Sequence, residues 1–235
     1  EDSTEFSTDI ANAFQGSQNM TKYNQVGAAT SAVTNFKATW SECSGITTFP
    51  LIDTSSGTNF QVTWNGCSGL TSFPLIDTSS ATRVDFTWLN CSGLTSFPQI
   101  DTSSVTNFGA AWQNCSGLTS FPSIDTSGGT TFSSSWAGCT GLTTFPSLDF
   151  SSGTNFAGGW RDSTSLTTYP ANRFDSTGTL GSLAFNNSWI NCALTAQSIE
   201  NILTSLDTNG AQNITLGIHA GTNAAKSTWS TAANT

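Results

Sequence analysis

Cysteine and aspartate, two residue types that can carry chemistry, return at a fixed interval along this chain. Cysteines stand at 43, 67, 91, 115 and 139, and the aspartates are Asp53, Asp77, Asp101, Asp125 and Asp149. Thiols in register could form disulfides or bind a metal, and a row of carboxylates could bind calcium, which prefers oxygen ligands. Both columns have the same period of 24 residues, so one architecture must account for both.

The cysteine column favours buried structural thiols. Equivalent positions in stacked repeats lie about 4.8 Å apart and point the same way, whereas a disulfide needs Cβ atoms about 3.8 Å apart with a dihedral near 90°. The sequence also lacks the short C-x₂-C spacing of zinc sites. We therefore expect no metal at these thiols, which pack as small apolar side chains.

The aspartate column allows two interpretations. Stacked carboxylates about 5 Å apart repel by roughly 1–4 kcal/mol per pair, depending on the dielectric. The first interpretation is a turn in which each carboxylate accepts hydrogen bonds from the following Thr-Ser-Ser. The second is a row of bound calcium ions, but one carboxylate per repeat supplies few of the six to eight oxygens needed. We prefer the turn and keep calcium as the one cofactor alternative.

Catalysis has little support in the sequence. The single histidine, His219, lies in an expected C-terminal strand, and the nucleophile, phosphate-binding and metalloprotease motifs are absent from the sequence. A carboxylate pair could hydrolyse a glycoside, but the aspartate column is too uniform to resemble one tuned acid–base pair. We expect a protein that is not an enzyme and holds no resident cofactor.

The period extends to most apolar residues. The stretch "CSGLTSFPLIDTSS" (67–80) has close copies at 43–56, 91–104 and 115–128, and tryptophans stand at 40, 64, 88, 112, 136 and 160. A fixed period of this length predicts a solenoid, in which each repeat buries its apolar side chains against its neighbours. We expect repeats over 1–193, with a degenerate first repeat at about 5–30, regular repeats over 31–160 and an irregular last one over 161–193.

Residues 194–235 are expected to form a cap and a tail. Thr195 is a suitable N-cap, and Ile199, Ile202, Leu203 and Leu206 form one apolar helical stripe that ends at Asn209-Gly210. The alternating segment 213–220 predicts a short strand.

The motif "W-N-G-C-S-G-L-T-S-F-P-L-I-D-T-S-S" resembles the BspA-type leucine-rich repeats of surface proteins over about four-fifths of the chain. The resemblance implies a non-enzymatic, extracellular or surface-exposed adhesion protein; related arrays also occur in viral and phage-like proteins. Together with the period, it predicts a mainly β fold: a right-handed, leucine-rich-repeat-like solenoid of about eight rungs with a helix–strand cap.

Composition restricts the partners. The net charge is −9 with only six Lys and Arg, which excludes nucleic acid and an anionic membrane surface as partners. The longest apolar runs are far shorter than the roughly 20 residues that cross a bilayer. The chain begins Glu1-Asp2 without methionine, which indicates a processed product or an excised piece.

Positions that vary between repeats are expected to face solvent and to carry the binding surface. They include Leu51, Leu75, Gln99, Phe86 and Leu89, which make the N-terminal half more apolar, as interfaces often are. The leading hypothesis is an extracellular adhesion or recognition module that binds a surface glycan or protein receptor along its flank. The alternative is a structural subunit of a virion fibre or extracellular filament that assembles with copies of itself. Ice binding by Thr and Ser rows is a distant third, since no clean Thr-x-Thr row runs through the repeats.

Overall fold

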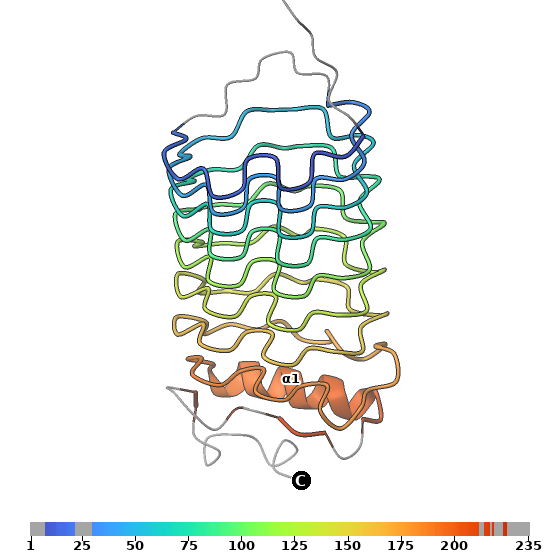
Figure 1. Ribbon diagram of the computed structural model, residues 1–235. Coiled ribbons are helices and arrows are strands. Elements are labelled where there is room, and N and C mark those ends of the chain that lie inside the picture. Colours follow the sequence, from blue (N-terminus) through green and yellow to red (C-terminus); the bar gives the residue numbers. More distant parts are fainter. Residues whose placement is uncertain (1–7, 22–29, 212–213, 217, 219–222, 225–235) are drawn as a thin grey trace, which may run out of the picture.

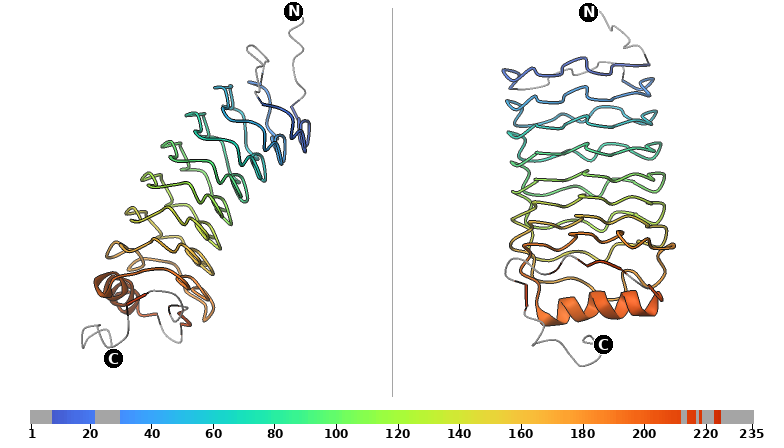
Figure 2. Two further views of the ribbon diagram at one scale, coloured as in Figure 1. Left: turned by 90° about the vertical axis from the view of Figure 1, so that its left-hand side faces the viewer. Right: turned by 60° about the horizontal axis from the view of Figure 1, so that its bottom comes forward.

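The chain winds into a stack of flattened coils, seen face-on in Figure 1 and edge-on in the left panel of Figure 2. This computed structural model describes residues 8–21, 30–211, 214–216, 218 and 223–224. Parallel backbone bridges join residues 24 apart in successive coils, from Asn35–Asn59 to Thr131–Asn155. The one helix among the described residues, α1 (Ala196–Thr208), lies across the C-terminal end of the stack.

Each coil has one undulating limb, which we call the turn limb. It comprises residues 35–42, 59–66, 83–90, 107–114, 131–138 and 155–162. Its backbone N–H groups use two kinds of partner: that of Phe108 donates to Thr131 O in the next coil (2.9 Å), and that of Ala111 donates to Phe108 O in its own coil (3.1 Å). The angle φ is positive at two positions four residues apart, here Ala110 (53°) and Asn114 (60°). The limb is therefore a succession of turns and not an extended strand.

The opposite limb of each coil, which we call the proline limb, comprises residues 47–54, 71–78, 95–102, 119–126 and 143–150. Its proline has no N–H and so removes one backbone donor from each coil. A threonine hydroxyl supplies a replacement, because the buried Thr78 donates to Asp101 O and Thr102 donates to Asp125 O in the next coil. The side chain of one coil thus binds the backbone of the next where the proline cannot.

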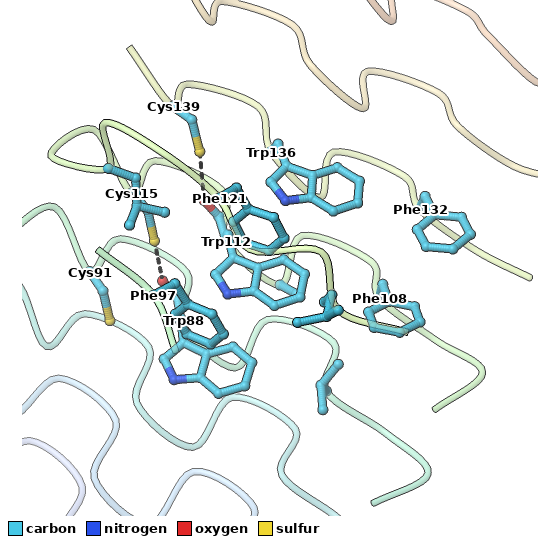
Figure 3. Packing of buried hydrophobic residues seen from close by; sticks show 14 of the residues in the cluster. Trp88, Cys91, Phe97, Phe108, Trp112, Cys115, Phe121, Phe132, Trp136 and Cys139 are labelled. Atoms are coloured by element: carbon cyan, nitrogen blue, oxygen red, sulfur yellow. Dashed lines mark hydrogen bonds between the residues drawn. The ribbon is translucent and has the colours of Figure 1, made fainter. Parts of the chain in front are cut away.

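Aromatic columns fill the interior between the two limbs (Figure 3). Trp88, Trp112 and Trp136 stack with ring centroids 5.5 and 5.7 Å apart. Phe97 of the proline limb stands edge-on to Trp88 at 4.8 Å and to Trp112 at 5.4 Å. The stacked column runs through eight levels: Phe14, Trp40, Trp64, Trp88, Trp112, Trp136, Trp160 and Trp189. Each aromatic pair contributes about 0.5–1.5 kcal/mol beyond its buried area, so the column fixes the register of the coils.

The prediction of a mainly β, leucine-rich-repeat-like solenoid is wrong. Only 6% of the residues are helical and 5% are strand, and the described residues contain no sheet; the coils are joined by isolated bridges. The left-handed positions in the turn limb and the prolines in the other limb prevent extended pairing. The strand expected over 213–220 is not formed at residues 214–216 and 218, and its remaining positions, His219 among them, lie outside the described residues.

The predicted C-terminal helix is confirmed, with Thr195 as its N-cap and Asn209 as its C-cap. Its buried apolar face is formed by Ile199, Ile202 and Leu206. Two buried serines on α1 accept hydrogen bonds from the last coil: Ser198 Oγ from Tyr169 N (3.0 Å) and Ser205 Oγ from Phe174 N (2.7 Å). The helix thereby supplies acceptors to backbone donors of the terminal coil.

A glycine two residues after each of the five regularly spaced cysteines allows the coils to approach closely, and its replacement should separate them. A Cβ added at Gly117 would lie 2.7 Å from both Ser92 O and Leu94 O, which are backbone atoms of the preceding coil. We expect Gly117→Ala to lower the free energy of unfolding by about 1–3 kcal/mol, measured by denaturant titration. Gly128→Ala is the matched control, because its Cβ would meet only contacts of 3.4 Å. Equal stability of the two variants would contradict the role given to Gly117.

Candidate functional site

The cysteine column is part of the core. Cys115 Sγ lies 3.1 Å from Trp88 O of the preceding coil, as Figure 3 shows. Where the column changes to serine, Ser163 Oγ makes the equivalent bond to Trp136 O at 2.9 Å. All six cysteines are described and buried, and none forms a disulfide. The prediction of buried structural thiols is confirmed, since each acts as a donor that binds one coil to the next.

The aspartate column forms the expected turns on the exposed edge of the proline limb. Asp77 Oδ1 accepts hydrogen bonds from Ser79 N (2.9 Å) and Ser79 Oγ (2.7 Å). The same pair of bonds forms at Asp53, Asp101 and Asp125, and the backbone bond alone forms at Asp149. Within the described parts of the chain, no group of three or more His, Cys, Asp or Glu side chains could hold a metal ion. The calcium row stays a prediction.

The five residues predicted to form one binding surface lie on two surfaces. Leu51 (72% exposed), Leu75 (63%) and the exposed Gln99 belong to the proline limb of successive coils. Phe86 (41% exposed) and the half-buried Leu89 belong to the turn limb. Because the inner side chains of the two limbs meet in the core, their outward side chains lie on opposite outer surfaces. The structure therefore divides the predicted surface into an aliphatic patch and an aromatic site.

Phe86 forms one wall of a groove on the outer surface of the turn limb. The groove has a volume of about 290 Å³ and spans three coils; it is lined by Asp85, Phe86, Asn107, Gly109, Ala110, Gln113, Thr131, Ser133 and Ser134. It exists because side-chain size falls along one column, from Phe86 to Ala110 and Ser134. The breaks in repeat identity at these positions are the sequence signal for the groove.

The backbone holds Phe86 in a costly conformation. Its φ is 59°, a left-handed value that is a genuine outlier for a bulky side chain and costs on the order of 1–3 kcal/mol. The hydrogen bond from Phe86 N to Gly109 O (2.9 Å) maintains this geometry. The equivalent position has a positive φ in every regular coil, at Ala38 (53°), Val62 (64°), Ala110 (53°) and Ser134 (56°). The conformation therefore belongs to the turn limb, and Phe86 is distinguished by the size of its side chain.

Asp85 fixes the chain beside the groove. Its side chain is only 3% exposed and accepts two hydrogen bonds from Arg83, Nε to Oδ1 at 3.0 Å and Nη2 to Oδ2 at 2.9 Å. Gln61 Nε2 donates a third bond to Oδ2 at 2.7 Å. The carboxylate charge is thus neutralised beneath the surface, and the groove presents uncharged groups.

A second groove continues on the same outer surface toward the C-terminus. It has a volume of about 480 Å³ and is lined by Thr154, Asn155, Ala157, Gly181, Ser182, Leu183, Ala184 and Asn186. Leu183, 63% exposed, was missed in the sequence because it lies in the insertion that interrupts the period. Asn107 was also missed, because asparagine recurs at this position and its Oδ1 accepts a turn bond from Gly109 N (2.9 Å).

The thiols should not react with thiol reagents while the coils are intact. Burial raises the pKa of Cys67, Cys139 and Cys192 to about 12, and the reactive thiolate is therefore scarce at pH 8. We expect an aromatic disulfide reagent to label none of the five cysteines from Cys67 to Cys192 in native protein and all six cysteines in guanidinium chloride. Rapid labelling of a native thiol other than Cys43, at the N-terminal end of the column, would show that the stack opens.

The acid sensitivity of the fold should depend on the aspartate turns. The hydroxyls of Ser55, Ser79 and Ser127, followed by their backbone N–H groups, lower the pKa of Asp53, Asp77 and Asp125. A lowered folded pKa gives stability that is present above the unfolded pKa of about 3.9 and is lost as pH falls through the folded value. Between pH 5 and pH 2 the Tm of the wild type should fall more steeply than that of a triple variant in which Asp53, Asp77 and Asp125 are replaced by Asn.

Thermal unfolding with calcium and with chelator belongs to the same experiment. The turn alone predicts equal Tm values in both buffers, whereas a calcium row predicts a higher Tm with calcium that the triple variant loses.

Comparison with protein-family models, curated proteins and solved structures gave no match. None of the described helical residues forms a segment long and apolar enough to cross a membrane. The resemblance of the repeats to surface proteins stays an expectation, and the outer surfaces of the coils are where a function can be sought.

Proposed function

We propose that the protein is a non-catalytic recognition module, extracellular or surface-exposed, that binds a surface ligand along the outer face of its turn limbs. The observation that carries this proposal is the exposed aromatic ring of Phe86 beside a groove lined by amides and hydroxyls. An aromatic side chain that only filled space would gain little at this position, since Ala110 and Gly158 occupy it in other coils.

The rigidity of the stack supports this role. The coils around the groove are joined by backbone bonds such as Ala110 N to Ser133 O (2.8 Å) and Ser134 N to Ala157 O (2.9 Å). A site on such a frame loses little conformational entropy when it binds, which favours affinity from a small contact area.

A second candidate function follows from the aliphatic patch on the proline limb. Leu51 and Leu75 are the most exposed leucines on neighbouring coils, and paired exposed leucines can bury against another protein. This observation supports a structural subunit that assembles side by side with copies of itself.

Sedimentation velocity over a range of concentrations separates the two functions. A recognition module is expected to be monomeric and to bind intact cells saturably, with competition by unlabelled protein. A structural subunit is expected to form a defined oligomer that Leu51→Ser with Leu75→Ser disrupts, whereas Phe86→Ala leaves it intact. Oligomers without cell binding would refute the recognition module and support the alternative.

A further inference from the structure

We propose that the groove beside Phe86 binds an uncharged saccharide, with one sugar ring against the phenyl ring and its hydroxyl groups bonded to side chains of the next two coils. This inference rests on the proposed recognition function and specifies its ligand class. It requires three properties of the site: an accessible aromatic ring, uncommitted hydrogen-bonding groups and the absence of net charge.

The aromatic ring provides the apolar part of the site. A pyranose ring has one face of C–H groups, which carry partial positive charge, and the face of a phenyl ring is electron-rich. Phe86 is 41% exposed and stands next to Gly109, which has no side chain, and Ala110, which has only a methyl group, so space remains beside the ring. The groove volume of about 290 Å³ is at the small end for ligand pockets, which suits one or two sugar rings better than a folded protein loop.

The polar part comes from amides and hydroxyls on the neighbouring coils. Asn107 Oδ1 is held by Gly109 N (2.9 Å), which orients the amide and leaves its NH₂ group as a donor to a ligand. Gln113 forms no side-chain hydrogen bond with the described residues, so its amide can both donate and accept. Ser133 Oγ donates to Ala157 O (3.1 Å) and retains lone pairs that can accept from a sugar hydroxyl.

Charge excludes other ligand classes. The one ionisable residue that lines the groove, Asp85, is neutralised by Arg83 and buried, so the site does not attract a cation. The chain carries a net charge of −9, which disfavours sulfated, phosphorylated or sialylated partners. An uncharged ligand with many hydroxyl groups fits both facts.

The second groove lies on the following coils of the same outer surface, within reach of a longer chain of sugars bound beside Phe86. Its residues Asn155 and Ala157 occupy the same columns as Asn107 and Gly109, two coils further along the stack. Phe86 and Leu183 stand toward the two ends of this stretch of the outer surface, and Ser133 and Ser134 lie between them. An oligosaccharide that runs along the stack axis would therefore contact several coils in succession.

The test is a glycan array that carries neutral glucans, mannans, galactans and chitin oligosaccharides, with sialylated and sulfated glycans as the charged set. We expect wild type to bind at least one neutral oligosaccharide. Phe86→Ala should weaken this binding about tenfold, in line with the loss of one aromatic contact, and Phe86→Trp should retain it. The matched control is Val62→Ala, at the same strained position one coil earlier but outside the groove; it should bind like wild type.

The outcomes separate this inference from the proposed function. Binding to intact cells that survives Phe86→Ala and periodate oxidation of glycans, but is lost after protease treatment, would overturn the saccharide and keep the recognition module. Salt-sensitive binding to the charged set alone would also overturn the uncharged ligand. No binding to the array or to cells would remove both proposals, provided that circular dichroism shows the same fold in every variant.

Discussion

Direct stacking of like aromatic rings in successive coils is the interaction on which the rest of the structure depends. Seven tryptophans and Phe14 form one column, and the phenylalanines of the proline limb stand edge-on between them. An indole ring must find a ring of the same shape and orientation above and below it, which explains why fourteen residues are repeated with so little change. The stacking also offsets two unfavourable features of the fold. The indole N–H groups of Trp64 to Trp189 lack hydrogen-bond acceptors among the described residues, and Val62 and Phe86 have left-handed backbone conformations.

The sequence predicted the period, the interior columns, the terminal helix and the buried thiols, but not the secondary structure of the coils. The spacing of Phe60, Trp64 and Cys67 is i, i+4 and i+7, which differs from the alternation of a strand with one buried face. In the turn limb the positive-φ positions are four residues apart, so inward-facing side chains recur at about this interval and not at every second residue. The second such position holds Gly, Asn, Asp or Glu in every regular coil, and most of these residues adopt the left-handed region easily. A 24-residue period alone does not distinguish such coils from β rungs.

The candidate site was predictable only in part. Positions that vary between repeats indicate which side chains face solvent, but they do not show which of these side chains lie next to one another. Phe86 and Leu89 were recognised as outward-facing, yet they were grouped with Leu51 and Leu75, which lie on the other limb. The repeat alone does not show which variable positions belong to the turn limb and which to the proline limb, so it cannot assign them to one outer surface or the other. Asparagine recurs at the position of Asn107 as a turn residue, so the sequence does not single it out, and its role at the groove comes from the NH₂ group that the turn bond leaves available.

The serines of α1 have a consequence for the growth of such an array. Ser198 and Ser205 occupy backbone donors of the last coil, so another copy cannot add to this end by continuing the same bonding pattern. Upstream of the helix every regular coil offers the same upper and lower surface, and the chain could gain or lose whole copies of 24 residues without altering the cap. Each added copy would lengthen the molecule by one coil and add one ring to the tryptophan column, in which neighbouring centroids lie 5.5 to 5.9 Å apart between Trp64 and Trp136. Gene duplication could therefore set the length of the molecule in uniform steps, while the outer columns remain free to diverge.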